Sequence, residues 1–188
     1  MINKILILLL IAQTTAFAEI RIRPHDWASR MIGADLDNFY KLDEKVYRSE
    51  QPDSQTFKQI EAFGIKSILN LRQFNSDDDE AEKTDLRLHR VKMNAGSVSY
   101  PQIMTALKKI KAADGPVLIH CWHGSDRTGV VSASYRVVFQ GWGKDKAIDE
   151  MKYGDYGYHQ KIYPELAKMI KNLNVNFFRK ELGIPGKK

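Results

Sequence analysis

The chain has very little cysteine, because Cys121 is the only one among its 188 residues. No disulfide can therefore form within the chain, and the thiol serves either packing or chemistry. Proline and glycine are also sparse, at six and twelve residues, which excludes collagen-like and low-complexity classes. No apolar run reaches the roughly 20 residues that a membrane-spanning helix needs.

The remaining composition is that of one globular domain, with 43% hydrophobic and 28% charged residues. The 29 lysines and arginines exceed the 23 acidic residues and give a net charge of +6, which favours an anionic ligand. Basic and aromatic residues are not interleaved as in nucleic-acid-binding segments, so we expect no nucleic-acid partner. The five histidines show no metal-ligand spacing, and we expect neither a metal nor another cofactor.

The first 18 residues have the features of a bacterial-type signal peptide. Lys4 provides a positive start, residues 5–12 are an unbroken apolar run, and Ala16-Phe17-Ala18 matches the small-x-small cleavage pattern. We predict cleavage after Ala18, a single domain over residues 19–188, export to the periplasm or secretion, and no stable membrane span after cleavage. An uncleaved anchor and a buried first helix are the alternatives.

The hydrophobic pattern of the rest alternates between strands and helices. It predicts a hairpin over 39–41 and 46–48, and strands over 65–71, 88–93 and 117–119. It predicts helices over 54–63, 78–86, 101–113, 128–139, 144–151 and 164–173. This order indicates an α/β domain with a mainly parallel central sheet of four to five strands, flanked by helices.

The most informative segment is His120-Cys121-Trp122-His123-Gly124-Ser125-Asp126-Arg127-Thr128-Gly129. It connects a buried strand to a helix, where α/β proteins bind ligands. Seven residues, from Cys121 to Arg127, are about enough to surround an oxyanion with backbone N–H groups, and the helix directs its positive end at the same point. Both effects favour the nucleophilic thiolate, and Arg127 can hold two phosphate oxygens.

This segment resembles the His-Cys-x5-Arg-Ser/Thr signature of the cysteine-dependent protein tyrosine phosphatase superfamily. Together with residues 46–52 and 64–72, it is similar to the compact dual-specificity group in a bacterial-type version. The resemblance implies the cysteine-phosphatase fold, with Cys121 as nucleophile, Arg127 as phosphate clamp and Thr128 as an aid to thiolate release. It implies that His120 orients the loop. The substrate-binding residues would be Trp122, His123, Gly124, Ser125 and, for a second anionic group, Arg72.

Most members of this family take a general acid from a loop about thirty residues before the cysteine, but residues 90–97 of this chain contain no aspartate. Asp126 lies beside Arg127, as in some phosphoinositide-active relatives, and we expect it to serve as acid and base. A role in holding the loop together is the alternative. Asp77, Asp78 and Asp79 are reserve candidates, although their position after Ser76 is also typical of a helix cap.

We therefore predict a monomeric phosphatase that hydrolyses phosphotyrosine, and phosphoserine or phosphothreonine as further substrates, through a phosphocysteine at Cys121. A phosphoinositide or inositol-polyphosphate phosphatase with the same site is the main alternative. A non-catalytic phosphate-binding module is a remote one, since Cys121, Asp126 and Thr128 are all present. A sulfurtransferase or arsenate reductase fits less well, because the chain has no second, resolving cysteine.

Overall fold

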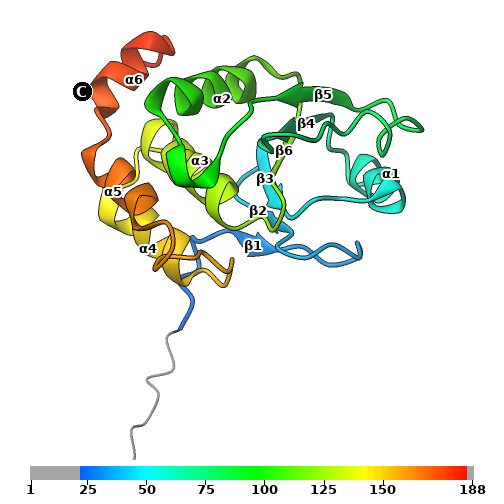
Figure 1. Cartoon of the computed structure of the whole chain (residues 1–188), viewed down its shortest axis with the longest axis horizontal. Helices are drawn as coiled ribbons and strands as arrows, with labels where there is room; N and C mark the ends of the chain where they lie inside the picture. The colour runs from blue at the N-terminus through cyan, green and yellow to red at the C-terminus, as the bar shows by residue number, and fades with distance from the viewer. Residues whose placement is uncertain (1–21, 186–188) are drawn as a thin grey trace, which may run out of the picture.

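The computed structural model describes residues 22–185, so the predicted signal peptide and its cleavage site lie outside the described residues. Along this part of the chain, helices follow and interrupt the strands of one central sheet (Figure 1). The strands are β1 (Ser29–Arg30), β2 (Tyr40–Lys41), β3 (Val46–Ser49), β4 (Ser67–Asn70), β5 (Arg87–Arg90) and β6 (Val117–His120). The helices are α1 (Ser54–Ala62), α2 (Tyr100–Ala112), α3 (Asp126–Val138), α4 (Lys144–Tyr153), α5 (Pro164–Asn172) and α6 (Val175–Glu181), with a 3₁₀ turn over Ala95–Ser97.

The sheet confirms the predicted α/β class, but it has six strands rather than four to five, in the order β1-β2-β3-β6-β4-β5. The strands β3, β6, β4 and β5 pair in parallel, while β1 and β2 add an antiparallel edge. The excess comes from β1, a two-residue strand too short to leave an alternating pattern in the sequence.

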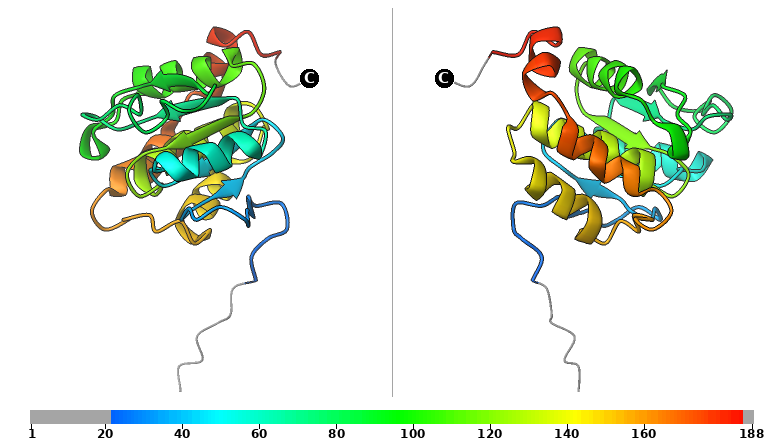
Figure 2. Two further views of the ribbon diagram at one scale, coloured as in Figure 1. Left: turned by 90° about the vertical axis from the view of Figure 1, so that its right-hand side faces the viewer. Right: turned by 60° about the vertical axis from the view of Figure 1, so that its left-hand side comes forward.

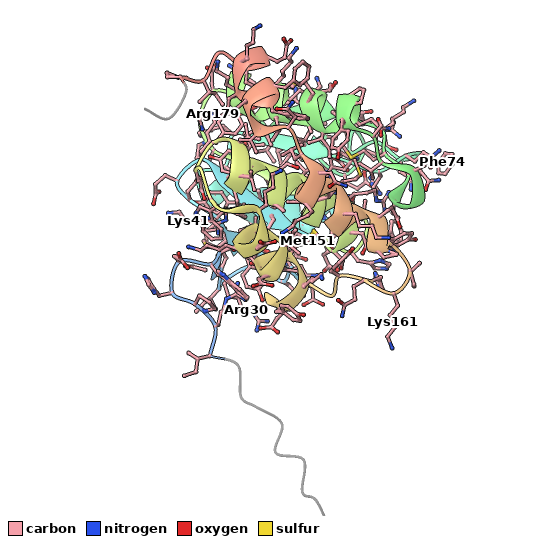
Figure 3. The ribbon with its side chains drawn as sticks, turned by 90° about the vertical axis from the view of Figure 1, so that its left-hand side faces the viewer. Arg30, Lys41, Phe74, Met151, Lys161 and Arg179 are labelled. Atoms are coloured by element: carbon pink, nitrogen blue, oxygen red, sulfur yellow. The ribbon has the colours of Figure 1, made fainter. Side chains whose placement is uncertain are left out.

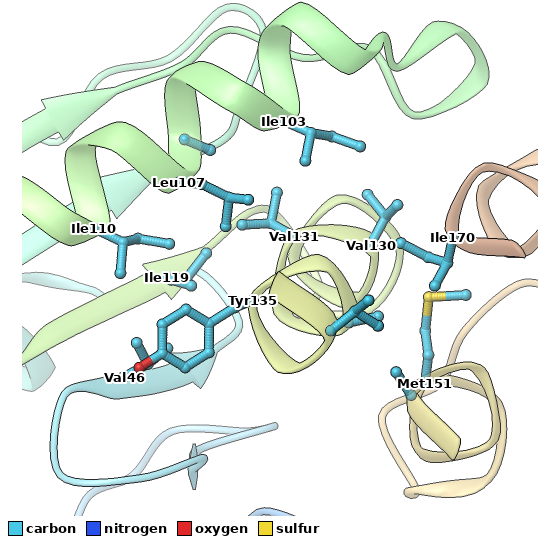
Figure 4. Close-up of a cluster of buried hydrophobic side chains, with 14 of the residues drawn as sticks. Val46, Ile103, Leu107, Ile110, Ile119, Val130, Val131, Tyr135, Met151 and Ile170 are labelled. Atoms are coloured by element: carbon cyan, nitrogen blue, oxygen red, sulfur yellow. The ribbon is translucent and has the colours of Figure 1, made fainter. Parts of the chain in front are cut away.

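The sheet is buried on both faces, because neighbouring residues of each central strand enter different cores. In β4, Ile68 joins a core with Phe57 and Ile60 of α1, whereas Leu69 joins the core on the opposite face. Figure 2 shows α1 in front of the sheet in one view, and α3, α4 and α5 in front in the other. The larger core joins the sheet to α2–α5 (Figure 4). Short apolar strands therefore form the rigid centre that positions the loops at their ends.

Helix α1 forms where the sequence predicts it, and its ends show why. The Asp53 side chain accepts a hydrogen bond from the Thr56 backbone N–H at 2.8 Å, completing a capping box. After the helix, Gly64 takes a φ of +87°, a conformation that glycine adopts without strain. Helix α2 likewise buries Ile103, Leu107 and Ile110, the three residues that predicted it.

The predicted helix over 78–86 is wrong, because this segment forms successive turns between β4 and β5. Its acidic start does not cap a helix, since the Asp77 side chain is directed to other parts of the fold. A short helix that the sequence pattern did not predict, α6, follows α5 and buries Phe178 against the larger core. No helix within residues 22–185 is long and apolar enough to cross a membrane.

Candidate active site

Three strands carry the candidate site to one edge of the sheet. The last residues of β3, β6 and β4 are Ser49, His120 and Asn70, and they lie side by side in register. Cys121 follows β6 directly, and α3 begins at Asp126. We call residues 121–127 the signature loop. The strand ends and the start of α3 therefore converge on this loop, as the sequence predicts.

The signature loop is held tightly against β3. Gly124 has a φ of +69°, and a Cβ atom added there would lie 2.5 Å from the backbone carbon and oxygen of Ser49. Arg48, which is only 2% exposed, donates a hydrogen bond of 2.6 Å to the Gly124 carbonyl oxygen. Its guanidinium lies 3.6 Å from the centre of the Tyr156 ring. Gly124 therefore supplies a close backbone approach that no other residue fits.

The same side of the loop is also bonded to the segment that precedes β2. Asn38 donates from its side-chain amide to the His123 carbonyl oxygen at 2.7 Å and to the Tyr156 carbonyl oxygen at 3.2 Å. The Ser125 hydroxyl donates to the His123 carbonyl oxygen at 3.3 Å. With the contact from Arg48, they occupy the carbonyl oxygens of His123 and Gly124, so the loop is anchored through its carbonyl groups.

Two polar atoms of the segment that follows Cys121 are buried without a hydrogen-bond partner among the described residues. Cys121 itself is buried, with 2% of its surface exposed. Among the described residues, neither Arg127 Nε nor Thr128 Oγ1 has a partner, although both atoms are buried. The Arg127 Nη1 atom makes one long contact of 3.4 Å with the Met93 carbonyl oxygen. Unpaired buried donors are costly, so this arrangement fits a site that is completed by an oxyanion.

Behind the signature loop, His120 forms part of a buried charged group. Its Nε2 atom lies 2.9 Å from Asp77 Oδ2, and its Nδ1 atom lies 3.1 Å from the Cys121 carbonyl oxygen. Asp77 Oδ1 accepts a hydrogen bond of 2.9 Å from Arg72. Burial opposes ionisation of the Asp77 carboxyl, but His120, Gln51 and Arg72 outweigh it and lower its pKa. Asp77 is therefore a charged partner of His120 and not a group that holds a transferable proton at neutral pH.

The Asp126 carboxylate is engaged by the segment after α4. Its Oδ1 atom accepts a hydrogen bond of 2.9 Å from the His159 backbone N–H, and its Oδ2 atom lies 3.0 Å from His159 Nδ1. The His159 ring also meets the His123 ring, edge to face, at 6.0 Å. These contacts tie the beginning of α3 to residues 156–159, so Asp126 and His159 act as a pair.

A cavity of about 320 Å³ opens beside Arg127. Its lining combines parts of the β4–β5 connection, the segment after β5, the signature loop and the α4–α5 connection. The lining residues are Arg72, Gln73, Phe74, Asn75, Asn94, Ala95, Trp122, Arg127 and Tyr163. Over the described residues, no carboxylate or imidazole lines it.

The structure thus brings Arg72, Trp122 and Arg127 together at the cavity, but not all predicted site residues. The Arg72 Nη2 atom donates to Asp77 and to the Ser76 carbonyl oxygen, whereas the buried Nε atom of Arg72 has no partner among the described residues. Asp78 and Asp79 are exposed on the turn after Asp77. Within residues 22–185, no group of three or more His, Cys, Asp or Glu side chains has the arrangement of a metal site.

Sequence reasoning missed two residues that hold the site together. Arg48 is within the 46–52 segment that carries the family resemblance, but its contact with Gly124 spans 76 residues of sequence. His159 has no partner at metal-ligand spacing, so only the fold reveals its contact with Asp126 33 residues earlier. No short-range signal in the sequence could have assigned either role.

Comparison with known proteins agrees with this geometry. The tyrosine phosphatase family matches residues 35–183. The chain is 35% identical over 124 residues to the dual specificity protein phosphatase TpbA of Pseudomonas aeruginosa, covering 64% of this chain and 56% of that protein. It is also 35% identical over 124 residues to the rice inositol diphosphatase DSP1, covering 60% and 54% of the two chains. It therefore spans a little over half the length of these curated relatives.

The crystal structure of a cysteine-to-serine variant of P. aeruginosa TpbA, in complex with phosphotyrosine, has the same fold. It superposes with a TM-score of 0.76 at 26% identity and covers 86% of this chain and 99% of that chain. The family match extends over all strands of the parallel part of the sheet and over the complete signature loop. The chain therefore belongs to the tyrosine phosphatase family.

Proposed function

We propose that this chain hydrolyses phosphomonoesters through a phosphocysteine intermediate at Cys121. One observation carries the proposal: a buried cysteine begins the signature loop at the end of β6, and at the other end of the loop two buried polar atoms, Arg127 Nε and Thr128 Oγ1, lack partners among the described residues. An oxyanion bound in the signature loop would give Arg127 Nε a partner, and the Cys121 thiolate would give one to the Thr128 hydroxyl. The family membership supports the same reading.

In the first step, the Cys121 thiolate attacks phosphorus in line with the bond to the leaving oxygen. The S–P bond forms as the P–O bond breaks, and the leaving oxygen takes a proton from an acid. Arg127 and the loop N–H groups hold the phosphoryl oxygens and balance their charge in the transition state. In the second step, water attacks phosphorus, phosphate leaves, and the thiolate returns with help from the Thr128 hydroxyl.

Asp126 is the proposed acid and base of these steps, as the only carboxyl group within the signature loop. Both of its oxygens contact His159 in the structure, so proton donation requires a protonated carboxyl that has turned from the ring. His159 therefore becomes the second residue to test. If the pair only holds the loop, its loss slows all substrates alike, whereas loss of an acid slows substrates with poor leaving groups most.

The deciding experiment compares Cys121→Ser, Asp126→Asn and His159→Gln with the wild type on an aryl phosphate and an alkyl phosphate. Cys121→Ser should abolish turnover but keep phosphate binding. Asp126→Asn should lower kcat for the alkyl ester by roughly 10²–10³-fold and for p-nitrophenyl phosphate by much less. Wild-type rates in Cys121→Ser would refute covalent catalysis at this residue, and equal slowing of both esters would locate the acid elsewhere.

We propose phosphotyrosine as the main substrate, because the cavity suits an aromatic ester. Phe74, Trp122 and Tyr163 line it, and aromatic side chains pack favourably against a phenyl ring. A phenolate also needs less help from an acid than an alkoxide, and no carboxylate lines the described part of this cavity. Phosphoserine and phosphothreonine are accordingly proposed as slower substrates.

Inositol phosphates and phosphoinositides are the second candidates. The loops around the cavity contain Arg72, Lys92 and Lys161 but no acidic residue over 72–76, 92–99, 122–125 and 156–163, which favours a highly anionic substrate. One of the similar proteins is named an inositol diphosphatase. A panel of phosphotyrosine peptides, inositol polyphosphates and phosphoinositides, run with Cys121→Ser as the blank, ranks the candidates by kcat/KM.

The cellular setting is also part of the proposal. We propose that residues 1–18 direct export and that the chain from Glu19 works as a monomer in the periplasm or outside the cell. The support is the charge and hydrophobicity pattern of the first 18 residues. Cell fractionation and light scattering of the exported chain test the compartment and the monomeric state separately.

A further inference from the structure

Large apolar side chains stand on the surface around the cavity beside Arg127. Phe74 is 82% exposed and Trp122 is 52% exposed, and both line the cavity. Ile162 is 65% exposed and precedes Tyr163, which also lines the cavity. They come from three separate connections: the β4–β5 segment, the signature loop and the α4–α5 segment. We call Phe74, Trp122 and Ile162 the apolar rim.

Positive charge accompanies the apolar rim. Lys161 is exposed beside Ile162, and Lys92 is exposed on the segment that leads to Asn94 in the cavity. Figure 3 shows Phe74 and Lys161 projecting from the same side of the molecule. Of the acidic residues near the apolar rim in sequence, Asp77 and Asp126 are buried, and Asp79 and Glu80 line a different cavity beside α1. The other two are Asp78, which is exposed, and Glu165, which is half-buried. The surface around the cavity beside Arg127, which we call the mouth of the site, is therefore both apolar and positively charged.

We propose that the apolar rim and its lysines dock the protein onto an anionic phospholipid bilayer, with the mouth of the site facing the lipid headgroups. Exposed apolar side chains next to lysines are the combination that binds the interface of anionic membranes. Trp is also favoured at the level of the headgroups. This inference goes beyond the proposed function, because it concerns where the site is presented and not which ester it cleaves.

The shape of the rim favours a bilayer over a peptide as its partner. A bound peptide needs a groove or a strand edge into which its side chains insert. Phe74 and Ile162 instead project from the surface, since most of their area is free. A bilayer requires no complementary groove, only apolar groups that reach the same level and positive charge around them.

The test is sedimentation with vesicles of phosphatidylcholine alone, or with about a third phosphatidylglycerol, at two salt concentrations. The chain from Glu19 is used, because it contains every described helix and strand and lacks the apolar residues 5–12. We expect binding to the anionic vesicles that weakens with salt. Phe74→Ser and Ile162→Ser should each lower the partition coefficient about tenfold. Lys161→Gln should lower it about fivefold.

The matched control is Phe177→Ser on α6. It removes another exposed apolar side chain, since Phe177 is 52% exposed. No residue of α6 lines the cavity beside Arg127, so this variant should bind vesicles like the wild type. Ile162 does not line the cavity, and Ile162→Ser should hydrolyse p-nitrophenyl phosphate at the wild-type rate. Cys121→Ser should bind vesicles normally, which separates docking from turnover.

Three results would overturn the proposal. One is equal binding of the wild type to neutral and anionic vesicles, and another is unchanged partition of Phe74→Ser and Ile162→Ser. The third is unchanged partition together with a raised KM of Ile162→Ser for a phosphotyrosine peptide, which would make the apolar rim a peptide-binding surface. The binding measurements do not depend on whether Cys121 is the nucleophile, so they stand if the proposed function fails.

Discussion

Replacing Asp77 with asparagine removes a negative charge that two buried basic side chains share. The side chains of Asp77, Arg72 and His120 are 2%, 5% and 0% exposed, and each contact with the carboxylate is 2.9 Å long. In Asp77→Asn, the amide oxygen can still accept one hydrogen bond, but the Arg72 guanidinium keeps its charge with no carboxylate opposite it.

Breaking a buried ion pair by neutralising one partner costs about 3–5 kcal/mol. Because asparagine retains one acceptor, we expect a loss near the lower limit, about 3 kcal/mol in the free energy of unfolding at pH 7. For a chain of this size, that loss corresponds to a decrease in Tm of roughly 6–12 °C. The matched control is Asp79→Asn, an exposed residue of the same turn, which should change stability by less than about 0.5 kcal/mol.

The pH dependence gives an independent check. The pKa of Asp77 is lowered in the folded state, so its stabilising contribution is complete above its unfolded value, about 3.9, and is lost as the pH falls through the lower, folded value. The difference between wild type and Asp77→Asn should be present at pH 5 and shrink as the pH falls below about 4. Urea unfolding followed by circular dichroism measures it. Equal stability of the two proteins at pH 7 would refute the reasoning.

Three further predictions concern the loop, the missing acid and export. Gly124→Ala should lower kcat/KM by at least about tenfold, since the added Cβ meets the Ser49 backbone at 2.5 Å, whereas Gly143→Ala, with open space around it, should leave activity unchanged. Asn94→Asp places a carboxyl in the cavity and should raise the alkyl-to-aryl rate ratio about tenfold or more; an unchanged ratio would show that position 94 does not reach the leaving oxygen. Mass analysis of the exported protein should start at Glu19, and an intact Met1 would contradict signal cleavage.

Local signals in the sequence were sufficient for most of the fold. The cap at Asp53 and the stop at Gly64 are fixed by neighbouring residues, and α1 therefore forms as predicted. The apolar strand β6 and the helical spacing of Ile103 and Leu107 likewise reflect burial patterns that repeat along a single element. The position of Cys121 at the end of β6 follows from the same patterns.

The errors arose where distant contacts override local preference. The segment after Asp77 has the composition of a helix start, but the Asp77 carboxylate binds His120, 43 residues away, and the chain forms turns instead. The acidic residues 77–80 therefore predicted the start of a helix, whereas the first of them, Asp77, binds His120 behind the signature loop. In the same way, the contact of Arg48 with Gly124 depends on the pairing of β3 with β6, which no short segment encodes.

The central claim is that a phosphoryl group passes through Cys121, and rapid quenching of the reaction with a ³²P-labelled phosphotyrosine peptide tests it most directly. The account predicts labelled protein that forms and decays during turnover, with the label on the peptide containing Cys121 and none in Cys121→Ser. Turnover without labelled protein, or a label on another residue, would contradict it.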